Sequence, residues 1–540
     1  MKHILLLSVL LISSLLSNAQ EVELSISPLR FQGVHDLTGP DRVTRGYYAV
    51  YRSGSGEWTI DVVDATLQPL FKTIISVPSN AFFNDVAYDG AHILVCFVEA
   101  SFKREITYVS IDSKGSEVAR DVRSKVPFLN QGERFYPQVW VHPKGGFVIT
   151  ELVKERKNSG VKYEYVDGSL TPKWSHEQWV DKGTLHVYEA FGNKQSMVFI
   201  QGHERSGNTL STSAICLAAS DGNVVYEHQM STENEVFFPS AIHLSDDGVF
   251  AASGIYYNGA AIRGKNARGM FFTTLSPTGI VESTVLSDWK SLRPIMQTAV
   301  NSWFLRVNPT LWMHQMERKT DGSYTLIGEL FRYRGEFTET EPGSSDKTVY
   351  HRNLILDFIT FEVTPDAEIK AVNRIARPHM LLKNEKPDEF TSNQNTFEYI
   401  YDQRTSQIDR FRALKKFGGL SFRHASYVGD QTLLMSFMQY EASIKYGIVV
   451  NALQPTNIYE IPLTKSKPRW FSVGELMTNI LAQYDAEDPD EVAVTRVRYY
   501  DESDDVFSGI KPANGRQVLV YEYMPLKGKL YLSLINTDAL

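Results

Sequence analysis

The sequence contains very little cysteine for its length. Cys96 and Cys216 are the only two in 540 residues. Both lie in strand-like segments that are well separated along the chain, so we expect two buried free thiols and no disulfide. A scaffold held together by disulfides is therefore excluded, and the stability of the fold has to come from the burial of apolar side chains.

The sequence also lacks the usual catalytic and metal-binding signatures. It has no Gly-x-Ser-x-Gly elbow, no His-Glu-x-x-His motif, no Walker loop and no Cys-x-x-Cys pair. Two acidic clusters, residues 485–491 and 501–505, lack the alternating Asp/Asn spacing and the turn glycine of a calcium loop, and we interpret them as solvated loops. We therefore predict no cofactor and no metal site, and the catalytic residues, if there are any, stay unknown.

Long apolar runs are confined to the start of the chain. Lys2 precedes the apolar segment Ile4–Ile12, and small or polar residues follow as far as Ala19. This pattern predicts a signal peptide over residues 1–19 and a periplasmic or secreted protein. No later run reaches the roughly 20 apolar residues that span a bilayer, so we expect no transmembrane segment after cleavage.

Neither sign of charge dominates the composition. The chain has 55 Lys and Arg against 63 Asp and Glu, which gives a formal net charge of −8. This balance argues against nucleic acid as a partner. The abundance of Tyr and Phe, together with the scarcity of segments with helical periodicity, predicts an all-β protein.

An internal repeat indicates the architecture. The segment Phe237–Leu244, an Asp-Gly turn at Asp247-Gly248 and a second apolar run together predict a β-hairpin. The segment Phe135–Ile149 has the same pattern, and its Pro137 aligns with Pro239 at an offset of 102 positions. We interpret this offset as two repeats of about fifty residues each, which is the period of a four-stranded propeller blade.

The same four-strand pattern recurs along the whole chain. We predict a single β-propeller over residues 20–540, with seven or eight four-stranded blades. The candidate units cover residues 24–75, 83–122, 135–174, 186–226, 237–281, 312–372, 422–463 and 492–534. Because the last unit lacks a fourth strand, the spare segment Val22–Ile26 is predicted to complete it and close the ring. A pair of β-sandwiches is the competing architecture, but it does not explain the repeat.

The turns Ser245–Gly248 and Thr320–Gly322 resemble the Ser-Pro-Asp-Gly hairpin turns of TolB-like and WD40-like propeller repeats. The Trp-Asp dipeptide and the sialidase Asp-box are absent. The whole chain, signal peptide included, resembles the uncharacterised exported β-propeller families of Bacteroidota, which are domains of unknown function. This resemblance implies a fold and a compartment but no activity.

Four long segments interrupt the later units: residues 287–309, 334–353, 378–420 and 464–491. Three of them join the last strand of one blade to the first strand of the next, and one joins the second and third strands of a blade. Both types of connection emerge on the same face of a propeller, so we expect the insertions to cluster there. Amphipathic helices are predicted near Ser406–Leu414 and Val473–Tyr484, either as a plug or as a lid over a ligand pocket.

A polar residue recurs in the second strand of several units, at Glu151, Gln201, Glu329 and Glu522. A carboxylate in an apolar strand is costly unless it is paired or reaches the rim of the channel. Next to one long insertion, this position joins a group of charged residues that we predict as a ligand-binding site: Glu329, Arg332, Arg334, His351 and Arg352. Such groups suit a sugar or an anionic ligand, and the alternative is a salt bridge between blades.

Two functions from different classes therefore stay open. The first is an exported module or scaffold that binds a protein, a glycan or another anionic ligand at the face with the insertions. The second is a carbohydrate-active hydrolase or lyase that uses carboxylates such as Glu329, and this chemistry needs two carboxyl groups about 5 to 10 Å apart.

Overall fold

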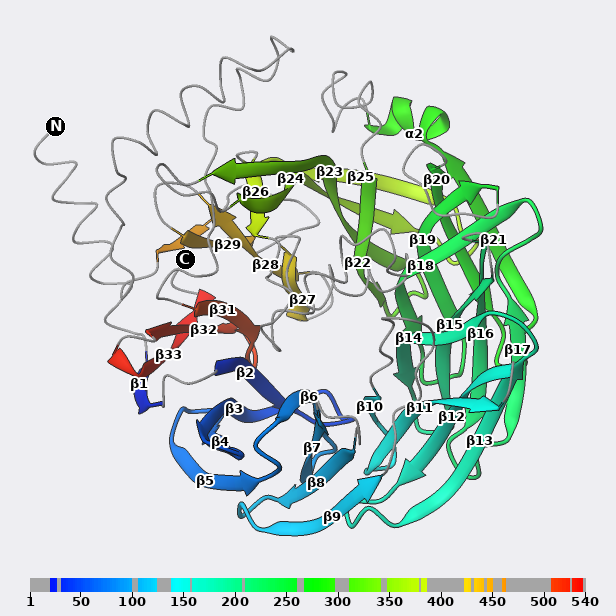
Figure 1. Ribbon diagram of the computed structural model, residues 1–540. Coiled ribbons are helices and arrows are strands. Elements are labelled where there is room, and N and C mark those ends of the chain that lie inside the picture. Colours follow the sequence, from blue (N-terminus) through cyan, green and yellow to red (C-terminus); the bar gives the residue numbers. More distant parts are fainter. Residues whose placement is uncertain are drawn as a thin grey trace, which may run out of the picture.

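The computed structural model describes most of the blades and part of the connections between them. The described residues are 20–26, 31–99, 105–123, 137–155, 158–205, 209–259, 267–296, 310–340, 347–377, 380–385, 422–428, 432–440, 444–449, 459–462, 507–524 and 527–537. They form eight antiparallel sheets arranged in a ring around a central axis (Figure 1). The protein is therefore a single β-propeller, as the sequence predicts, and the described sheets number eight.

The strands follow each other from the inner to the outer side of each blade, in the order A, B, C, D. Blades 1 to 4 consist of β2 (Phe31–Thr38), β3 (Thr44–Gly54), β4 (Glu57–Asp64), β5 (Pro69–Ser76); β6 (Ala81–Tyr88), β7 (His92–Glu99), β8 (Ile106–Asp112), β9 (Glu117–Arg123); β10 (Gln138–Val141), β11 (Phe147–Glu155), β12 (Asn158–Val166), β13 (Pro172–Val180); and β14 (Thr184–Gly192), β15 (Ser196–Arg205), β16 (Thr209–Ala218), β17 (Val224–Gln229).

Blades 5 to 8 continue in the same way, with additions. They consist of β18 (Glu235–Leu244), β19 (Phe250–Asn258), β20 (Ala267–Leu275), β21 (Val281–Asp288); β22 (Thr310–Arg318), β23 (Tyr324–Thr340), β24 (Lys347–Val363), β25 (Ile369–Ile375), with β26 (Met380–Glu385) also paired to β24; β27 (Phe422–Val428), β28 (Thr432–Tyr440), β29 (Ile444–Val449), β30 (Tyr459–Pro462); and β31 (Phe507–Pro512), β32 (Gln517–Met524), β33 (Lys529–Asn536), β1 (Gln20–Ser25).

The first strand of the chain closes the ring. β1 pairs antiparallel with β33, from Gln20 opposite Leu534 to Ser25 opposite Lys529, and forms strand D of blade 8. The predicted closure by Val22–Ile26 is therefore confirmed. Three strands were missed by the sequence analysis, β2, β26 and β31; β2 and β31 have no clean apolar alternation. The segment 492–500, predicted as strand A of the last blade, lies outside the described residues.

The internal repeat corresponds to strands A and B of blades 3 and 5. Pro137 directly precedes β10 and Pro239 lies in β18, so the offset of 102 residues spans two blades. The turns are also equivalent, because the amides of Gly145 and Gly248 each donate to a carbonyl three residues back at 3.0 Å. Their offset is 103 residues, since the bulge at Ser240 adds one residue to β18. Both glycines have a φ near +87°, a conformation that favours glycine, which explains the turn signal in the sequence.

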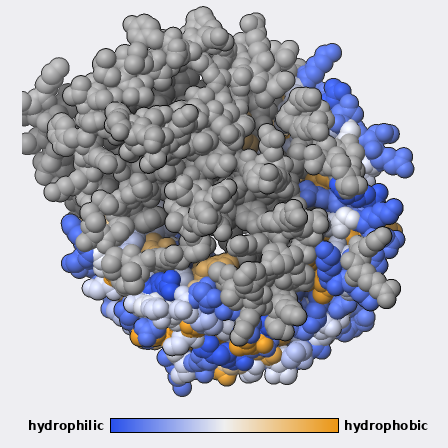
Figure 2. All heavy atoms as spheres, viewed as in Figure 1, coloured by the Kyte–Doolittle hydropathy of each residue, from blue (hydrophilic) through white to orange (hydrophobic). Residues whose placement is uncertain are grey.

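Burial follows the position of a strand in its blade. The middle strands, such as β7 and β8, are buried on both faces by the neighbouring blades. The outermost strands alternate and carry most of the exposed large apolar side chains: Leu70, Ile74, Val118, Val122, Trp179, Val224, Val225, Val281 and Leu286. In the coloured part of Figure 2, hydrophobic residues are scattered among hydrophilic ones, as is normal for a protein surface. Cys96 and Cys216 are buried and free, which confirms that prediction.

The insertions are described only in part. The first contains the short helix α2 (Trp289–Met296), which the sequence analysis did not predict; the Asp288 carboxylate accepts a hydrogen bond from the Ser291 amide at its start. The second is a continuation of β23 and β24, and the third contains β26. The two predicted helices, at 406–414 and 473–484, and both acidic clusters lie outside the described residues. No described helix is long and apolar enough to cross a membrane.

A buried histidine links blades 3 and 4. The Nε2 atom of His142 lies 2.9 Å from the carbonyl oxygen of Ala219, and its Nδ1 atom lies 3.2 Å from the amide nitrogen of Lys144. The carbonyl can only accept and the amide can only donate, so the neutral ring with its proton on Nε2 satisfies both. Burial lowers the pKa of His142 from 6.5 to about 4.

We expect acid to destabilise the protein through this residue. Because the pKa of His142 is lower in the folded than in the unfolded state, the unfolded chain takes up the proton first. Its contribution is complete above pH 6.5 and is lost as the pH falls towards 4, by roughly 3 kcal/mol at most, since one pKa unit is about 1.4 kcal/mol. Melting temperatures between pH 7.5 and 4.5 should fall less for His142→Asn than for the wild type. An equal fall in melting temperature for His142→Asn and the wild type would contradict the role assigned to His142.

Ring closure predicts a strong effect of an apolar substitution in β1. Leu24 is 8 % exposed and packs between blades 8 and 1. Leu24→Ala should lower the free energy of unfolding by about 2 kcal/mol, measured by urea titration. The matched control is Glu23→Gln, because Glu23 forms an exposed ion pair with Lys529 at 2.6 Å, and the loss of this pair should change stability by less than about 1 kcal/mol. Equal effects of the two variants would contradict a structural role for β1.

Candidate functional site

The polar residue that recurs in strand B lies between blades. Glu151 of β11 accepts a hydrogen bond from the Tyr108 hydroxyl of β8 at 2.8 Å and is 3.1 Å from Nη1 of Arg123 at the end of β9. The Arg123 guanidinium also reaches Glu164 of β12 at 2.6 Å and Asp121 at 2.7 Å. A cation of blade 2 therefore binds two carboxylates of blade 3, so this position is a salt bridge between blades.

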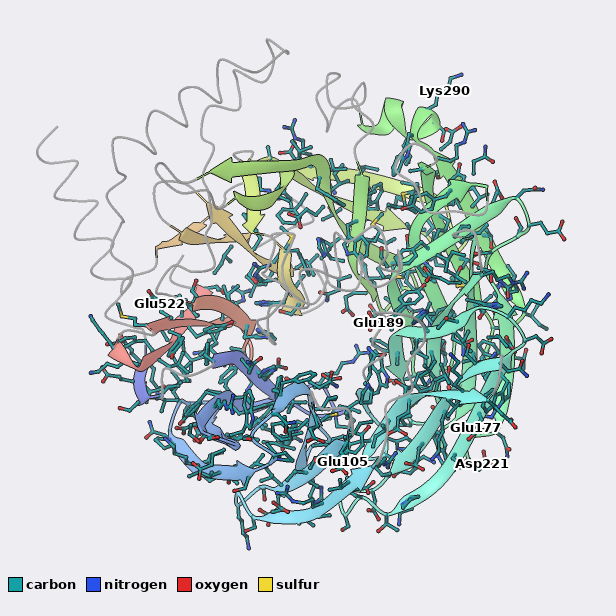
Figure 3. All side chains as sticks on the ribbon, viewed as in Figure 1. Glu105, Glu177, Glu189, Asp221, Lys290 and Glu522 are labelled. Carbon is teal, nitrogen blue, oxygen red and sulfur yellow. The ribbon has the colours of Figure 1, made fainter. Side chains whose placement is uncertain are left out.

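Gln201 occupies the same place one blade further along. Its amide nitrogen donates to the Tyr163 hydroxyl and to the side-chain oxygen of Gln178, both in blade 3, and its oxygen accepts from Ser213 at 3.1 Å. Tyr108 and Tyr163 each lie in strand C of the preceding blade. A tyrosine of strand C therefore meets the polar residue of the next strand B at two successive contacts. Glu522 of β32 is buried as well (Figure 3).

Removal of Arg123 should destabilise the contact between blades 2 and 3. Arg123→Met leaves Glu151 and Glu164 without their shared cation in a site where the side chains are less than one-fifth exposed. We expect a loss of roughly 3 kcal/mol in the free energy of unfolding. The control is Arg120→Gln, because Arg120 pairs with Glu117 on the exposed side of the same strand and should contribute less than about 1 kcal/mol. A loss for Arg120→Gln as large as for Arg123→Met would contradict the assignment.

Glu329 of β23 is fully buried within the chain. One carboxylate oxygen lies 2.5 Å from Nη2 of Arg377, and the other lies 2.8 Å from Nε2 of His314 and accepts from the Phe422 amide at 3.1 Å. The side chains of Glu329 and Arg377 are both 0 % exposed. Glu329 therefore binds three groups of the protein and is closed to a ligand.

Two local features bring these partners together. A register shift between Met313 and Gln315 leaves His314 as an extra residue in β22, and such a bulge redirects a side chain. Arg377 follows the end of β25, and its guanidinium lies 4.2 Å above the centre of the Phe358 ring. Burial lowers the pKa of Arg377 below its ordinary value, but the adjacent Glu329 carboxylate opposes the shift.

The other four predicted site residues lie in a projection of blade 6. We call it the arm: residues 331–340 of β23, residues 347–355 of β24, and β26. The arm is a three-stranded antiparallel sheet in which Arg352 is opposite both Gly335 and Lys383, and His351 is opposite both Glu336 and Asn384. Arg332 is opposite Leu354, and Arg334 lies at a register shift. The structure thus brings these four residues into the projecting part of the sheet, whereas Glu329 lies in the part of β23 that is buried in the blade.

The sequence analysis missed the residues that bind Glu329. Arg377 and Phe422 lie 48 and 93 positions away along the chain, so no local pattern connects them with it. It also missed β26 and therefore Lys383. A pairing between distant segments leaves no periodic signal, whereas the four arm residues were found because they follow one another in a predicted hairpin.

Bulges recur on the inner side of the ring. The strands A of blades 2, 4, 5, 6 and 7 each contain one extra residue that is skipped in the register with strand B, and every one is polar: Asn84, Tyr188, Ser240, His314 and Arg423. Figure 3 shows Glu189, which follows one of these bulges, on the inner side of the ring, whereas Glu177 and Asp221 lie on the outer rim. Within the described residues no cluster of three His, Cys, Asp or Glu side chains could hold a metal ion.

The A–B turn of blade 1 reaches across the face of the ring that is opposite to the arm. Arg42 lies in the A–B turn of blade 1, and its guanidinium is 5.1 Å from the ring centre of Phe191 in blade 4 and 4.0 Å from Glu317 in blade 6. Blades 1, 4 and 6 are not neighbours, so this turn crosses the face that carries the A–B turns. The arm lies on the other face, because it extends a B–C connection.

Comparison with family models shows the family. A model described as "Family of unknown function (DUF6770)" matches residues 1–338. The chain belongs to this family. A search of the curated proteins gives no match.

The protein is similar in architecture to several solved structures. The WD40 domain of SCAP from fission yeast matches at 7 % identity and a TM-score of 0.40, covering 96 % of this chain and 100 % of that one. The β-propeller domain of the Trilobed protease from Pyrococcus furiosus matches at 11 % identity and a TM-score of 0.33, covering 82 % and 95 %. A protein of unknown function from Bacteroides caccae matches at 12 % identity and a TM-score of 0.24, covering 51 % and 96 %. At these values the matches say nothing about activity.

Proposed function

We propose that this member of the family is an exported binding module, periplasmic or secreted, and that its arm binds an anionic glycan. The observation that carries the proposal is the arm itself, a sheet that continues a blade beyond the ring on the face of the B–C connection. The apolar start of the chain, from Lys2 to Ala19, supports export.

Charge supports the choice of ligand. The arm contains five Arg and Lys residues against three Glu, in a chain whose net charge is −8: Arg332, Arg334, Lys347, Arg352 and Lys383 against Glu336, Glu339 and Glu385. Three of the cations are arginines, whose planar guanidinium suits the carboxylate or sulfate groups of an acidic polysaccharide. Tyr333 and Tyr350 lie in the same sheet and add residues of the type that packs against sugar rings.

A hydrolase or lyase is a weaker alternative. The carboxylate on which that hypothesis depended, Glu329, is fully buried and bound to Arg377, His314 and the Phe422 amide. It has no free face for a glycosidic oxygen or for a water molecule, and general acid or base catalysis requires direct contact with the reacting group.

Binding to defined polysaccharides tests the proposal. The wild-type protein should bind polygalacturonate or heparin but not dextran in isothermal titration calorimetry, and its affinity should fall as salt rises. Arg332→Gln/Arg352→Gln should lower the affinity at least about tenfold, because a hydrogen bond to a charged group contributes roughly 1.5–3 kcal/mol. The control Arg120→Gln changes a charge on the outer rim and should leave the affinity unchanged. Failure of the wild type to bind either polyanion would refute the proposal.

A further inference from the structure

The buried Glu329 carboxylate lies where the arm leaves the blade. Glu329 is opposite Phe358 in the β23–β24 pair, and Phe358 is in turn opposite Ile375, the last residue of β25. Two positions further along β23, at Phe331, the arm begins. Only Leu330 separates Glu329 from the point where the sheet projects beyond the ring.

β25 and β26 are successive partners of one strand. Ile375 pairs with Phe358 of β24, and Met380 pairs with Ile355, so the chain advances five residues while β24 advances three. Arg377 lies in this irregular step. Its guanidinium lies 4.2 Å above the centre of the Phe358 ring, and its Nη2 atom lies 2.5 Å from a carboxylate oxygen of Glu329.

Further contacts hold Arg377 in place. The Arg377 amide donates to the Asp357 carboxylate at 3.2 Å, and its Nε donates to the Leu356 carbonyl at 2.5 Å. These groups belong to blade 6, so Arg377 joins the segment before β26 to the blade, in addition to the pairing of β26 with β24. Glu329 is the carboxylate that binds this side chain by a direct ion pair.

We propose that Glu329 is a positioning residue for the arm, which binds Arg377 and thereby fixes the register of β26 against β24. This proposal rests on the proposed function in that the aligned strand places Lys383 opposite Arg352, among the arm residues proposed to bind the ligand. Glu329 acts on the ligand only through Arg377 and β26. Glu329 is close to Arg332 and Arg334 in the sequence because it supports the site, and it does not itself contact the ligand.

Hydrogen exchange measured by mass spectrometry tests the positioning. In Glu329→Gln the amides of β26 should exchange at least about tenfold faster than in the wild type. A tenfold change is a fall of about 1.4 kcal/mol in the free energy of opening of β26. The amides of β25 and β22 should keep their wild-type rates. A second variant, Glu329→Gln/Arg377→Met, leaves no uncompensated buried charge and should fold while showing the same fast exchange in β26. The matched control is Glu151→Gln, which changes a paired strand-B carboxylate of blade 3 and should leave β26 unaffected.

Affinity for the polyanion provides the second measurement. At a temperature where circular dichroism shows them folded, both Glu329 variants should bind polygalacturonate or heparin about tenfold more weakly than the wild type. This loss corresponds to about 1.4 kcal/mol of binding free energy. Glu151→Gln should bind with wild-type affinity. Unchanged exchange in β26, or exchange that rises equally in β22, β25 and β26, would overturn the positioning role. If the wild type binds no polyanion, the proposed function fails, while the exchange rates still decide the role of Glu329.

Discussion

The contact between neighbouring blades is the constraint on which the structure depends. A blade has two faces, and both are covered by other blades, so any polar group in a middle strand must find its partner across that contact or within its own sheet. The protein meets this requirement in different ways around the ring. Glu151 binds an arginine of the preceding blade, Gln201 binds a tyrosine of the preceding blade, and Glu329 binds an arginine of its own blade.

These differences have a functional meaning. At Glu151 and Gln201 the polar contact joins two compact blades and does nothing else that the structure shows. Glu329 lies one position further along strand B than Glu151 does, and there the strand continues into a long extension of the sheet that pairs with an additional strand. The chain has thus placed a buried carboxylate close to the point where the arm, which departs from the four-strand repeat, leaves the blade.

The fold could be predicted in detail and the site only in part. Regular hairpins with Asp-Gly turns, as at Gly248, repeat at a fixed period, and closure by Val22–Ile26 followed from a missing fourth strand. The arrangement around Glu329 could not be predicted, because it depends on Arg377 and Phe422, which are distant in sequence and follow no period. The sequence showed that a buried carboxylate needs a partner, and it left a ligand and a protein group as alternatives. The coordinates show protein groups.

The pairing of β1 with β33 also has a consequence for the order of folding. The two strands are separated by nearly the whole chain, so this contact has the longest loop to close and forms only after all the other blades exist. Since a chain is synthesised from its N-terminus, β1 has to stay unpaired until the last residues of the protein have been made. During that time its exposed edge is open to pairing with other chains. The ring is therefore a structure whose first strand is also its last to fold.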